Sequence, residues 1–119
     1  QDQNTLSELG KIATQGPFIS GAPLAIIILM ENAPRPQLDA GRAIQQMELV
    51  AWSEGLGTCF VGVRIEEQQI AVKELLNIPS NLELITIMPY GYRPSSINRV
   101  GAPRKDLSQM VHREKFGGQ

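Results

Sequence analysis

The chain has 119 residues, with 11 Lys and Arg against 12 Asp and Glu, 42% hydrophobic residues, one Cys and one His. This length predicts a single domain over residues 1–119 that buries about two thirds of its unfolded surface. One cysteine excludes an internal disulfide, and one Cys with one His is too few for a zinc site, so we expect no metal. The near-neutral charge argues against a nucleic-acid partner. The longest apolar stretch, Ala22–Met30, is shorter than the ~18 to 20 residues of a membrane span, so we expect a cytoplasmic protein with no membrane partner.

Charge is unevenly distributed along the chain. Residues 1–92 carry five basic and ten acidic residues, whereas residues 93–119 carry six basic and two acidic ones. One interpretation of the basic tail is a solvated terminal segment, because charge runs usually lie in water. The other is an anion site built from Arg99, Arg104 and Lys105, because guanidinium and ammonium groups bind phosphate.

The first third of the chain predicts a helix, a strand and a loop. Thr5 and Glu8 have the spacing of a capping box and begin a predicted helix over residues 5–14. The β-branched run over 25–30 has no polar alternation, which predicts a central strand buried on both faces. Two prolines make a loop of residues 32–37.

The strongest periodic pattern predicts a helix over residues 39–54. Asp39 is placed to cap its start and Gly55 to end it. Leu49 and Trp52 lie off the main apolar face and form a second apolar patch, which packs either against a neighbouring helix or against another subunit. The main face consists of Ala40, Ala43, Ile44, Met47, Val50 and Ala51.

The remaining pattern predicts a strand over 58–63, a helix over 66–76, a strand over 82–88 and a last helical turn over 107–112. Asn77 is the expected stop of the second of these elements. Spacing does not determine whether the first two strands are parallel neighbours.

Few residues in these elements have recognisable chemistry. Gly55 and Gly57 follow a helix, and the place of a third glycine is Phe60, so they are not a dinucleotide fingerprint. Gly62 lies within a predicted strand, where a glycine costs stability and often marks the close approach of a ligand to the backbone. Cys59 is predicted to be a buried, inert thiol. The absence of a recognisable acid, base or nucleophile is typical of enzymes whose cofactor supplies the chemistry.

Several segments, in their order and spacing, resemble the nitroreductase-like family of FMN-dependent oxidoreductases. The resemblance implies an α+β fold with a central, mostly antiparallel sheet flanked by helices, and an intertwined homodimer with FMN at the subunit interface. It implies an enzyme that takes hydride from NADH or NADPH onto the flavin and passes it to nitroaromatic or quinone-like acceptors by a ping-pong route. The matching segments are Phe18–Pro23, Asp39–Gly62, Val72–Pro79, Met88–Tyr92, Arg104–Leu107 and Val111–His112.

The resemblance also implies a flavin site. The strand around Gly62 would lie against the isoalloxazine ring, with the N–H groups of Gly62 and Val63 near its N5/O4 edge. A missing Cβ would let the ring approach, and an N–H would stabilise charge that develops on reduction. A basic pair in the tail would bind the FMN phosphate. The implied cofactor-binding residues are Phe60, Val61, Gly62, Val63, Arg104 and Lys105.

Family members begin with an Arg-rich segment that binds the FMN phosphate and ribityl chain, and we find none in this chain. We therefore expect a domain that is incomplete relative to the full family domain. Three alternatives follow: a truncated fragment without activity, a chain whose partner supplies the missing part, or a shortened relative that has lost flavin binding. A non-catalytic flavin-binding or interaction subunit is a second hypothesis for the function. Flavin-dependent dehalogenation and flavin-ring cleavage are further alternatives on the same fold.

Overall fold

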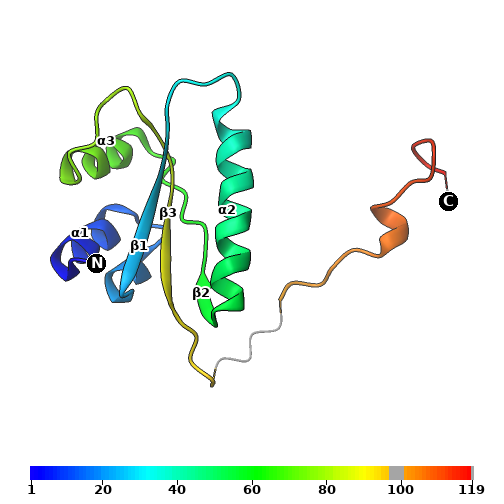
Figure 1. Ribbon diagram of the computed structural model, residues 1–119, viewed down its shortest axis with the longest axis horizontal. Coiled ribbons are helices and arrows are strands. Elements are labelled where there is room, and N and C mark those ends of the chain that lie inside the picture. The colour runs from blue at the N-terminus through cyan, green and yellow to red at the C-terminus, as the bar shows by residue number, and fades with distance from the viewer. Residues whose placement is uncertain (97–100, 119) are drawn as a thin grey trace.

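The computed structural model describes residues 1–96 and 101–118 (Figure 1). Within these residues, three strands form one antiparallel sheet in the order β1-β3-β2, with three α-helices around it. This arrangement confirms the α+β class with an antiparallel sheet flanked by helices. The elements are α1 (Gln3–Ile12), η1 (Pro17–Gly21), β1 (Leu24–Met30), α2 (Pro36–Ser53), β2 (Leu56–Thr58), α3 (Glu66–Leu75), β3 (Glu83–Tyr92) and η2 (Leu107–Gln109), where η denotes a 3-10 helix.

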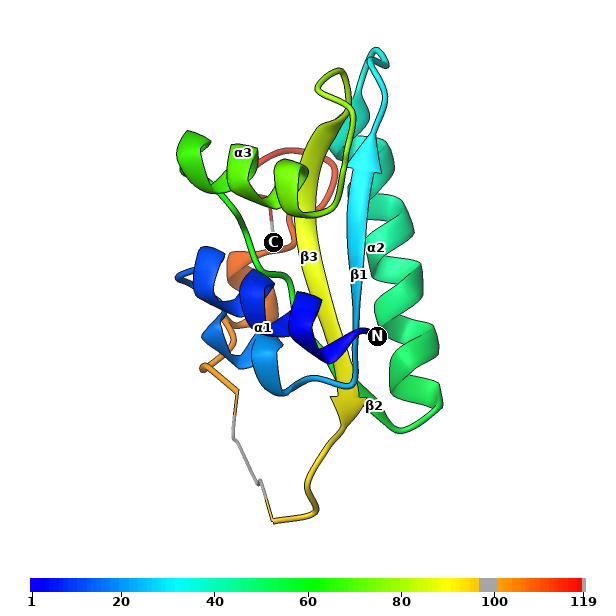
Figure 2. The same cartoon turned by 90° about the vertical axis from the view of Figure 1, so that its left-hand side faces the viewer.

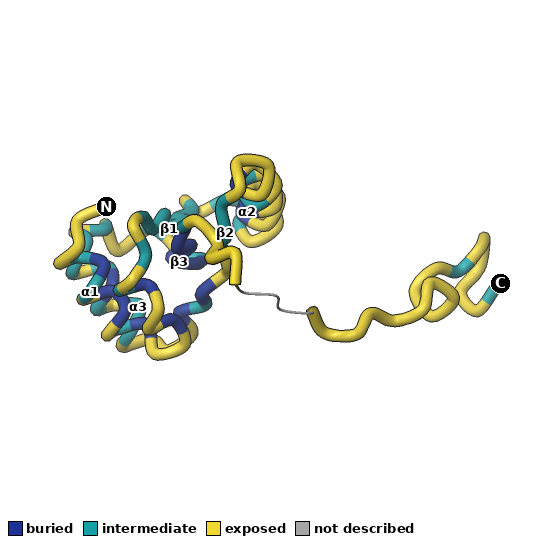
Figure 3. The backbone as a smooth tube through the Cα atoms, turned by 90° about the horizontal axis from the view of Figure 1, so that it is seen from below, coloured by how far each residue is buried: buried dark blue, intermediate teal, exposed yellow. Residues whose placement is uncertain are grey.

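The sheet lies between two layers of helix (Figure 3). Helices α1 and α3 lie side by side over one face (Figure 2), and α2 covers the other. The core on the first face, which we call the α1–α3 core, contains the fully buried Leu9, Ile19 and Ile87. The core on the second face, the α2 core, is built around Ile44, Met88 and small residues of α2.

Strand β1 is an edge strand of the sheet. It pairs with β3 from Leu24 opposite Tyr90 to Met30 opposite Glu83, and β2 pairs on the other side of β3. The prediction of a fully buried central strand over 25–30 is therefore wrong, since all seven residues of β1 are only partly buried. Its residues face the α1–α3 core and the α2 core alternately, so both faces are apolar although one edge is open. An apolar run indicates that both faces of a strand are covered, but it does not indicate whether the strand lies at the edge of its sheet.

The central strand β3 continues to Tyr92, four residues beyond its predicted end at Met88. Tyr90 and Tyr92 pair with Thr58 and Leu56 of β2, and this ladder keeps the chain extended past Pro89. The predicted strand over 58–63 is correspondingly shorter and earlier. The ladder between this strand and β3 ends at Thr58. Beyond that point a single β-bridge joins Val61 to Ile87.

Helices α1 and α2 start earlier than predicted, whereas α3 begins at Glu66 as predicted. Asp2 caps α1, because its carboxylate accepts hydrogen bonds from the Thr5 N–H and the Thr5 hydroxyl, both at 2.7 Å. These bonds, the backbone one first, lower the pKa of Asp2. Helix α2 begins at Pro36, since a proline suits the first turn of a helix, and Asp39 lies inside that turn and is not the cap.

The helix ends agree with prediction. Gly55 follows α2 with φ of +75°, a conformation that glycine adopts without steric cost. Asn77 follows α3 with φ of 52°, and asparagine tolerates this left-handed region better than most residues. Both residues therefore end their helices through their backbone conformation.

Residues 101–118 lie away from the body of the molecule (Figures 1 and 3). The predicted turn over 107–112 is present as η2, and beyond it the His112 and Phe116 rings pack with centroids 4.3 Å apart. Where the chain leaves β3, the Arg93 guanidinium lies 3.7 Å from the centre of the Trp52 ring. This cation–π contact ties the start of the tail to the end of α2.

Candidate functional site

The segment that follows β2 presents two different faces. Val61 and Val63 are 2% and 4% exposed and belong to the α1–α3 core. Phe60 and Arg64 are exposed, and they share the other face with Gly62 because side chains alternate along an extended chain. The buried valines therefore anchor a segment whose opposite face is open to a ligand.

Gly62 leaves a gap one side chain wide on this open face. A Cβ built on Gly62 would lie 3.5 Å from Phe60 Cε1 and 3.6 Å from Arg64 Nε. The aromatic ring and the guanidinium thus flank the space that a side chain would fill. A flat group can approach the backbone here because this space is empty of protein atoms.

Backbone hydrogen bonds hold the same segment in place. Val61 exchanges two bonds with Ile87, at 3.0 and 3.2 Å, and its carbonyl also accepts from the Thr86 hydroxyl at 3.0 Å. The Val63 carbonyl accepts from Gln69 Nε2 at 2.8 Å. Within the part of the chain that the structure describes, the N–H groups of Gly62 and Val63 donate to no protein acceptor. Two fixed donors are therefore free for a ligand.

Two hollows border this segment, and both are lined by Phe60, Gly62 and Arg64. The first, which we call the α1–α3 hollow, has a volume of about 630 Å³ and lies between the end of α1 and the start of α3. The second, the α2 hollow, has a volume of about 500 Å³ and extends toward Gly41 of α2 and Glu83 of β3. Both hollows are of ligand size, and they share Gly62 in their lining.

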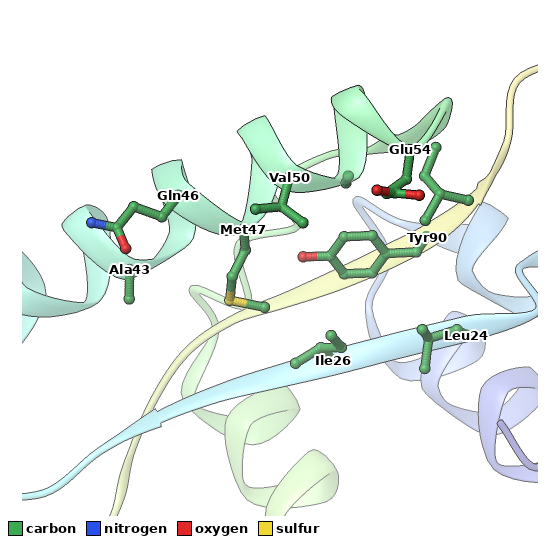
Figure 4. Close-up of a pocket in the computed structure, with 10 residues that line it drawn as sticks. Leu24, Ile26, Ala43, Gln46, Met47, Val50, Glu54 and Tyr90 are labelled. Atoms are coloured by element: carbon green, nitrogen blue, oxygen red, sulfur yellow. The ribbon is translucent and has the colours of Figure 1, made fainter.

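A third concavity is an apolar groove of about 530 Å³ between α2 and β1 (Figure 4). Met47 and Val50 of α2 face Leu24 and Ile26 of β1 across it, with the Tyr90 ring between them. Burial, and secondarily the Glu48 carboxylate, raises the pKa of the Tyr90 hydroxyl, which stays neutral at physiological pH. This groove offers packing surface more than reactive groups.

The outer face of α2 is exposed. Leu49 and Trp52 are 62% and 65% exposed, and among the described residues no helix of the chain packs over them. Of the two alternatives for the Leu49 and Trp52 patch, packing against a neighbouring helix is therefore not observed within the described chain. The remaining alternative for this face is a contact with another subunit.

The structure brings together four of the six residues implied as cofactor ligands. Phe60, Val61, Gly62 and Val63 form one segment, whereas Arg104 and Lys105 are exposed in the tail, away from the body of the molecule (Figure 1). Nothing in the described chain packs the tail against the body and brings the basic pair to Gly62. Arg99, the third residue of the predicted anion site, lies outside the described residues.

Two residues beside this segment differ from their predicted roles. Arg64 was not predicted as a site residue, although its position two residues after Gly62 on an extended chain was a usable signal. Cys59 is exposed, so its predicted burial is wrong, because the β2 ladder ends at Thr58 and leaves the next residue uncovered. Partial burial and the Glu48 carboxylate raise the pKa of the Cys59 thiol, which keeps it protonated.

Comparison with known proteins identifies the family of this chain. The sequence profile of the Nitroreductase family matches residues 8–92, so the chain belongs to the nitroreductase family. An Archaeoglobus fulgidus protein named "Putative NADH dehydrogenase/NAD(P)H nitroreductase" is 25% identical over 127 residues, which cover 98% of this chain and 71% of that protein.

Solved structures show the same fold. An FMN-dependent nitroreductase from Clostridium difficile has a TM-score of 0.80 and 26% identity, and the match covers 97% of this chain and 72% of that one. An iodotyrosine deiodinase, solved with FMN and 3-iodo-L-tyrosine, has a TM-score of 0.78 over 96% of this chain and 72% of its own. At 18% identity the second likeness shows the fold alone. The chain therefore has the nitroreductase fold and belongs to a family of NAD(P)H oxidoreductases with FMN-dependent members.

The described residues contain neither a membrane-spanning helix nor a cluster of metal-binding side chains. Over residues 1–96 and 101–118, no helix is long and apolar enough to cross a bilayer. The same residues hold no group of three or more His, Cys, Asp or Glu side chains placed to bind a metal ion.

Proposed function

We propose that the protein is an FMN-dependent NAD(P)H oxidoreductase that reduces nitroaromatic or quinone-like acceptors by a ping-pong route. The observation that carries this proposal is the pair of free N–H groups at Gly62 and Val63, beside a gap that a Cβ would fill. Bound FMN would accept hydride from the nicotinamide and pass it to the acceptor. With a nitro compound the reaction balances as ArNO2 + NADH + H+ → ArNO + NAD+ + H2O.

Each residue of the segment has a separate task in this proposal. Phe60 and Gly62 provide the surface for the ring, and the Gly62 and Val63 N–H groups donate to its edge. Val61 and Val63 hold the backbone in position through the α1–α3 core, so the donors need no reorganisation when charge develops. The segment thus fits the flavin that the family implies.

The tail is proposed to bind the phosphate group of FMN. Arg104 and Lys105 are exposed and adjacent, and a guanidinium with an ammonium suits a phosphate. Since they lie away from Gly62 in the single chain, the tail must fold onto a flavin site, its own or that of a second copy. We propose a homodimer formed through the exposed surface of α2, because Leu49 and Trp52 on its outer face and Val50 at the groove expose apolar surface there.

The cofactor assignment is tested by flavin binding to the purified chain. We expect a flavin absorption spectrum, or quenching of flavin fluorescence when FMN is added. Gly62→Val should abolish most of this binding, because its side chain fills the gap between Phe60 and Arg64. Gly21→Val is the matched control, since a Cβ on Gly21 meets no atom within 4 Å. A chain that ignores FMN, or a Gly62→Val variant that binds it normally, contradicts the proposal.

The phosphate assignment has its own test. Arg104→Ala should weaken FMN binding by about tenfold or more, the loss that corresponds to a hydrogen bond between charged groups. Arg113→Ala, which removes another exposed arginine of the tail, should leave the affinity unchanged. An equal affinity for FMN in the Arg104→Ala variant and the unmodified chain would show that the phosphate binds elsewhere.

A second candidate is a flavin-binding or interaction subunit that acts only with a partner chain. The separation of the 101–118 tail from the body of the molecule (Figure 1) favours it, because the proposed phosphate ligands and the Gly62 segment then lie in different parts of one chain. Mass in solution together with the flavin titration distinguishes the two. Flavin binding by a homodimer supports the enzyme, and binding only after a different chain is added supports the subunit.

A further inference from the structure

We propose that the α1–α3 hollow binds an aromatic carboxylate, with Arg64 as the ligand of its carboxylate group. That this molecule is the electron acceptor rests on the function proposed above. The binding of the carboxylate itself rests only on the residues that line the hollow, which are Thr14, Gln15, Phe60, Gly62, Arg64, Ile65 and Gln68.

The polar side chains of this hollow are all able to donate hydrogen bonds. They comprise one guanidinium, two amides and one hydroxyl, and no carboxylate lines the hollow. Gln68 Nε2 donates to the Thr14 hydroxyl oxygen at 3.0 Å, which leaves the Thr14 proton free to donate to a ligand. Glu66 and Glu67 begin α3 nearby, but neither contributes to the lining. The hollow therefore suits an anion.

Arg64 is available to bind that anion. Among the described residues the one ion pair joins Lys11 to Glu8, so no carboxylate of this part of the chain neutralises the Arg64 guanidinium. The planar fork of a guanidinium matches the two oxygens of a carboxylate with two parallel hydrogen bonds. This geometry favours a carboxylate over a neutral amide of the same shape.

The apolar wall of the hollow selects a ring. Phe60 and Ile65 each remain 52% exposed and line the hollow with Arg64. An aromatic ring packed on this wall removes apolar surface from water, while its carboxylate reaches the guanidinium. A volume of about 630 Å³ is ample for a substituted benzene ring.

The α2 hollow touches the same arginine but suits an anion less well. Glu83 lines it, and the Glu83 carboxylate accepts from Gln37 Nε2 at 2.7 Å. A second carboxylate there would meet a negative charge that the first hollow lacks. The two hollows therefore differ in charge, and the anion belongs in the α1–α3 hollow.

The position of Arg64 connects this binding to the flavin segment. Its Nε lies 3.6 Å from the place of a Cβ on Gly62, so a carboxylate held by Arg64 has its ring next to the Gly62 gap. If the flavin lies at that gap, the ring is adjacent to the atom that delivers hydride. Arg64 would then set the acceptor preference of the enzyme.

Binding is tested by calorimetry on the purified full chain with benzoate and benzamide, which share a ring and differ in charge. We expect benzoate to bind about tenfold or more tightly than benzamide. Arg64→Gln should reduce the affinity for benzoate to that for benzamide. Arg64→Lys keeps the charge without the planar guanidinium, so its affinity for benzoate should be intermediate. Arg42→Gln, an exposed arginine that lines neither hollow, is the matched control.

Equal affinities of the unmodified chain for benzoate and benzamide overturn the proposal. An Arg42→Gln variant that loses as much affinity for benzoate as Arg64→Gln also overturns it. FMN titration of the same proteins separates this result from the proposed function. Carboxylate binding without FMN binding supports the proposed carboxylate site and contradicts the proposed FMN-dependent oxidoreductase function. If FMN binds, a KM for 4-nitrobenzoate below that for 4-nitrobenzamide supports the acceptor role, and equal KM values overturn it.

Discussion

The two faces of the sheet are covered to different extents. Over one face, α1 and α3 bury Leu9, Ile19 and Ile87 to 1%, 0% and 0% exposure. Over the other, α2 buries only part of the apolar surface and leaves a groove of about 530 Å³ and the exposed Val50. The chain thus covers the α1–α3 core by itself, whereas apolar surface around the α2 core remains exposed and available to another molecule.

This difference has a functional consequence. The Gly62 segment is anchored through Val61 and Val63 in the closed core, so its backbone donors are fixed within the single chain. The exposed face of α2 has no such role, and we propose it as the contact between subunits. Rigidity for the chemistry and surface for association are therefore on opposite sides of the sheet.

A pair of identical substitutions gives the largest test of this difference. Leu9→Ala should lower the free energy of unfolding by about 2 to 5 kcal/mol, because it leaves a cavity in the closed core. Leu49→Ala, on the exposed face of α2, should change it by less than about 0.5 kcal/mol. Urea unfolding followed by circular dichroism measures both. Similar losses at the two positions would mean that the α2 face is also closed.

A charge placed on the open face should affect assembly. Val50→Glu should weaken the proposed dimer by about tenfold or more, because a buried carboxylate without a partner is costly. Ile70→Glu, at a residue 49% exposed on α3, should leave the mass in solution unchanged. Sedimentation over a range of concentrations measures the effect. A chain that is monomeric at all concentrations, or a Val50→Glu dimer of full strength, contradicts the proposed interface.

The smallest expected effect is a shift in the pKa of the Cys59 thiol, which is raised in part by the Glu48 carboxylate of α2. Burial first, and Glu48 second, raise its pKa, so alkylation by iodoacetamide should reach half of its maximal rate above pH 9.0. Glu48→Gln should move that midpoint downward. As the pH rises past the ordinary thiol value, the unfolded thiol loses its proton first, and the small stability contributed by the neutral thiol is lost. A midpoint at or below the ordinary value contradicts the assignment.

Much of the fold was predictable because its signals are local. The periodicity over 39–54 located α2, and Gly55 and Asn77 ended their helices as expected. Positions that depend on pairing were not predictable in this way. The open edge of β1 and the extension of β3 past Pro89 both depend on strands far apart in the sequence.

The candidate site divides in the same manner. Gly62 was recognisable as a glycine within a predicted strand, although the β2 ladder ends before it at Thr58, and the family resemblance implied a position beside a flavin. Arg64 has only its two-residue spacing from Gly62 as a sequence signal, and it acquires a role because the fold places it in one hollow with Thr14 and Gln68.

By itself the sequence determined the helices, the apolar faces and the membership of the family, because periodicity and residue spacing record which side of an element is buried. Only the tertiary structure decided which strand is the edge, that Cys59 is exposed, and that Arg104 and Lys105 lie apart from Gly62 in one chain. These properties arise from contacts between segments that are distant along the chain. A local pattern carries no record of such contacts.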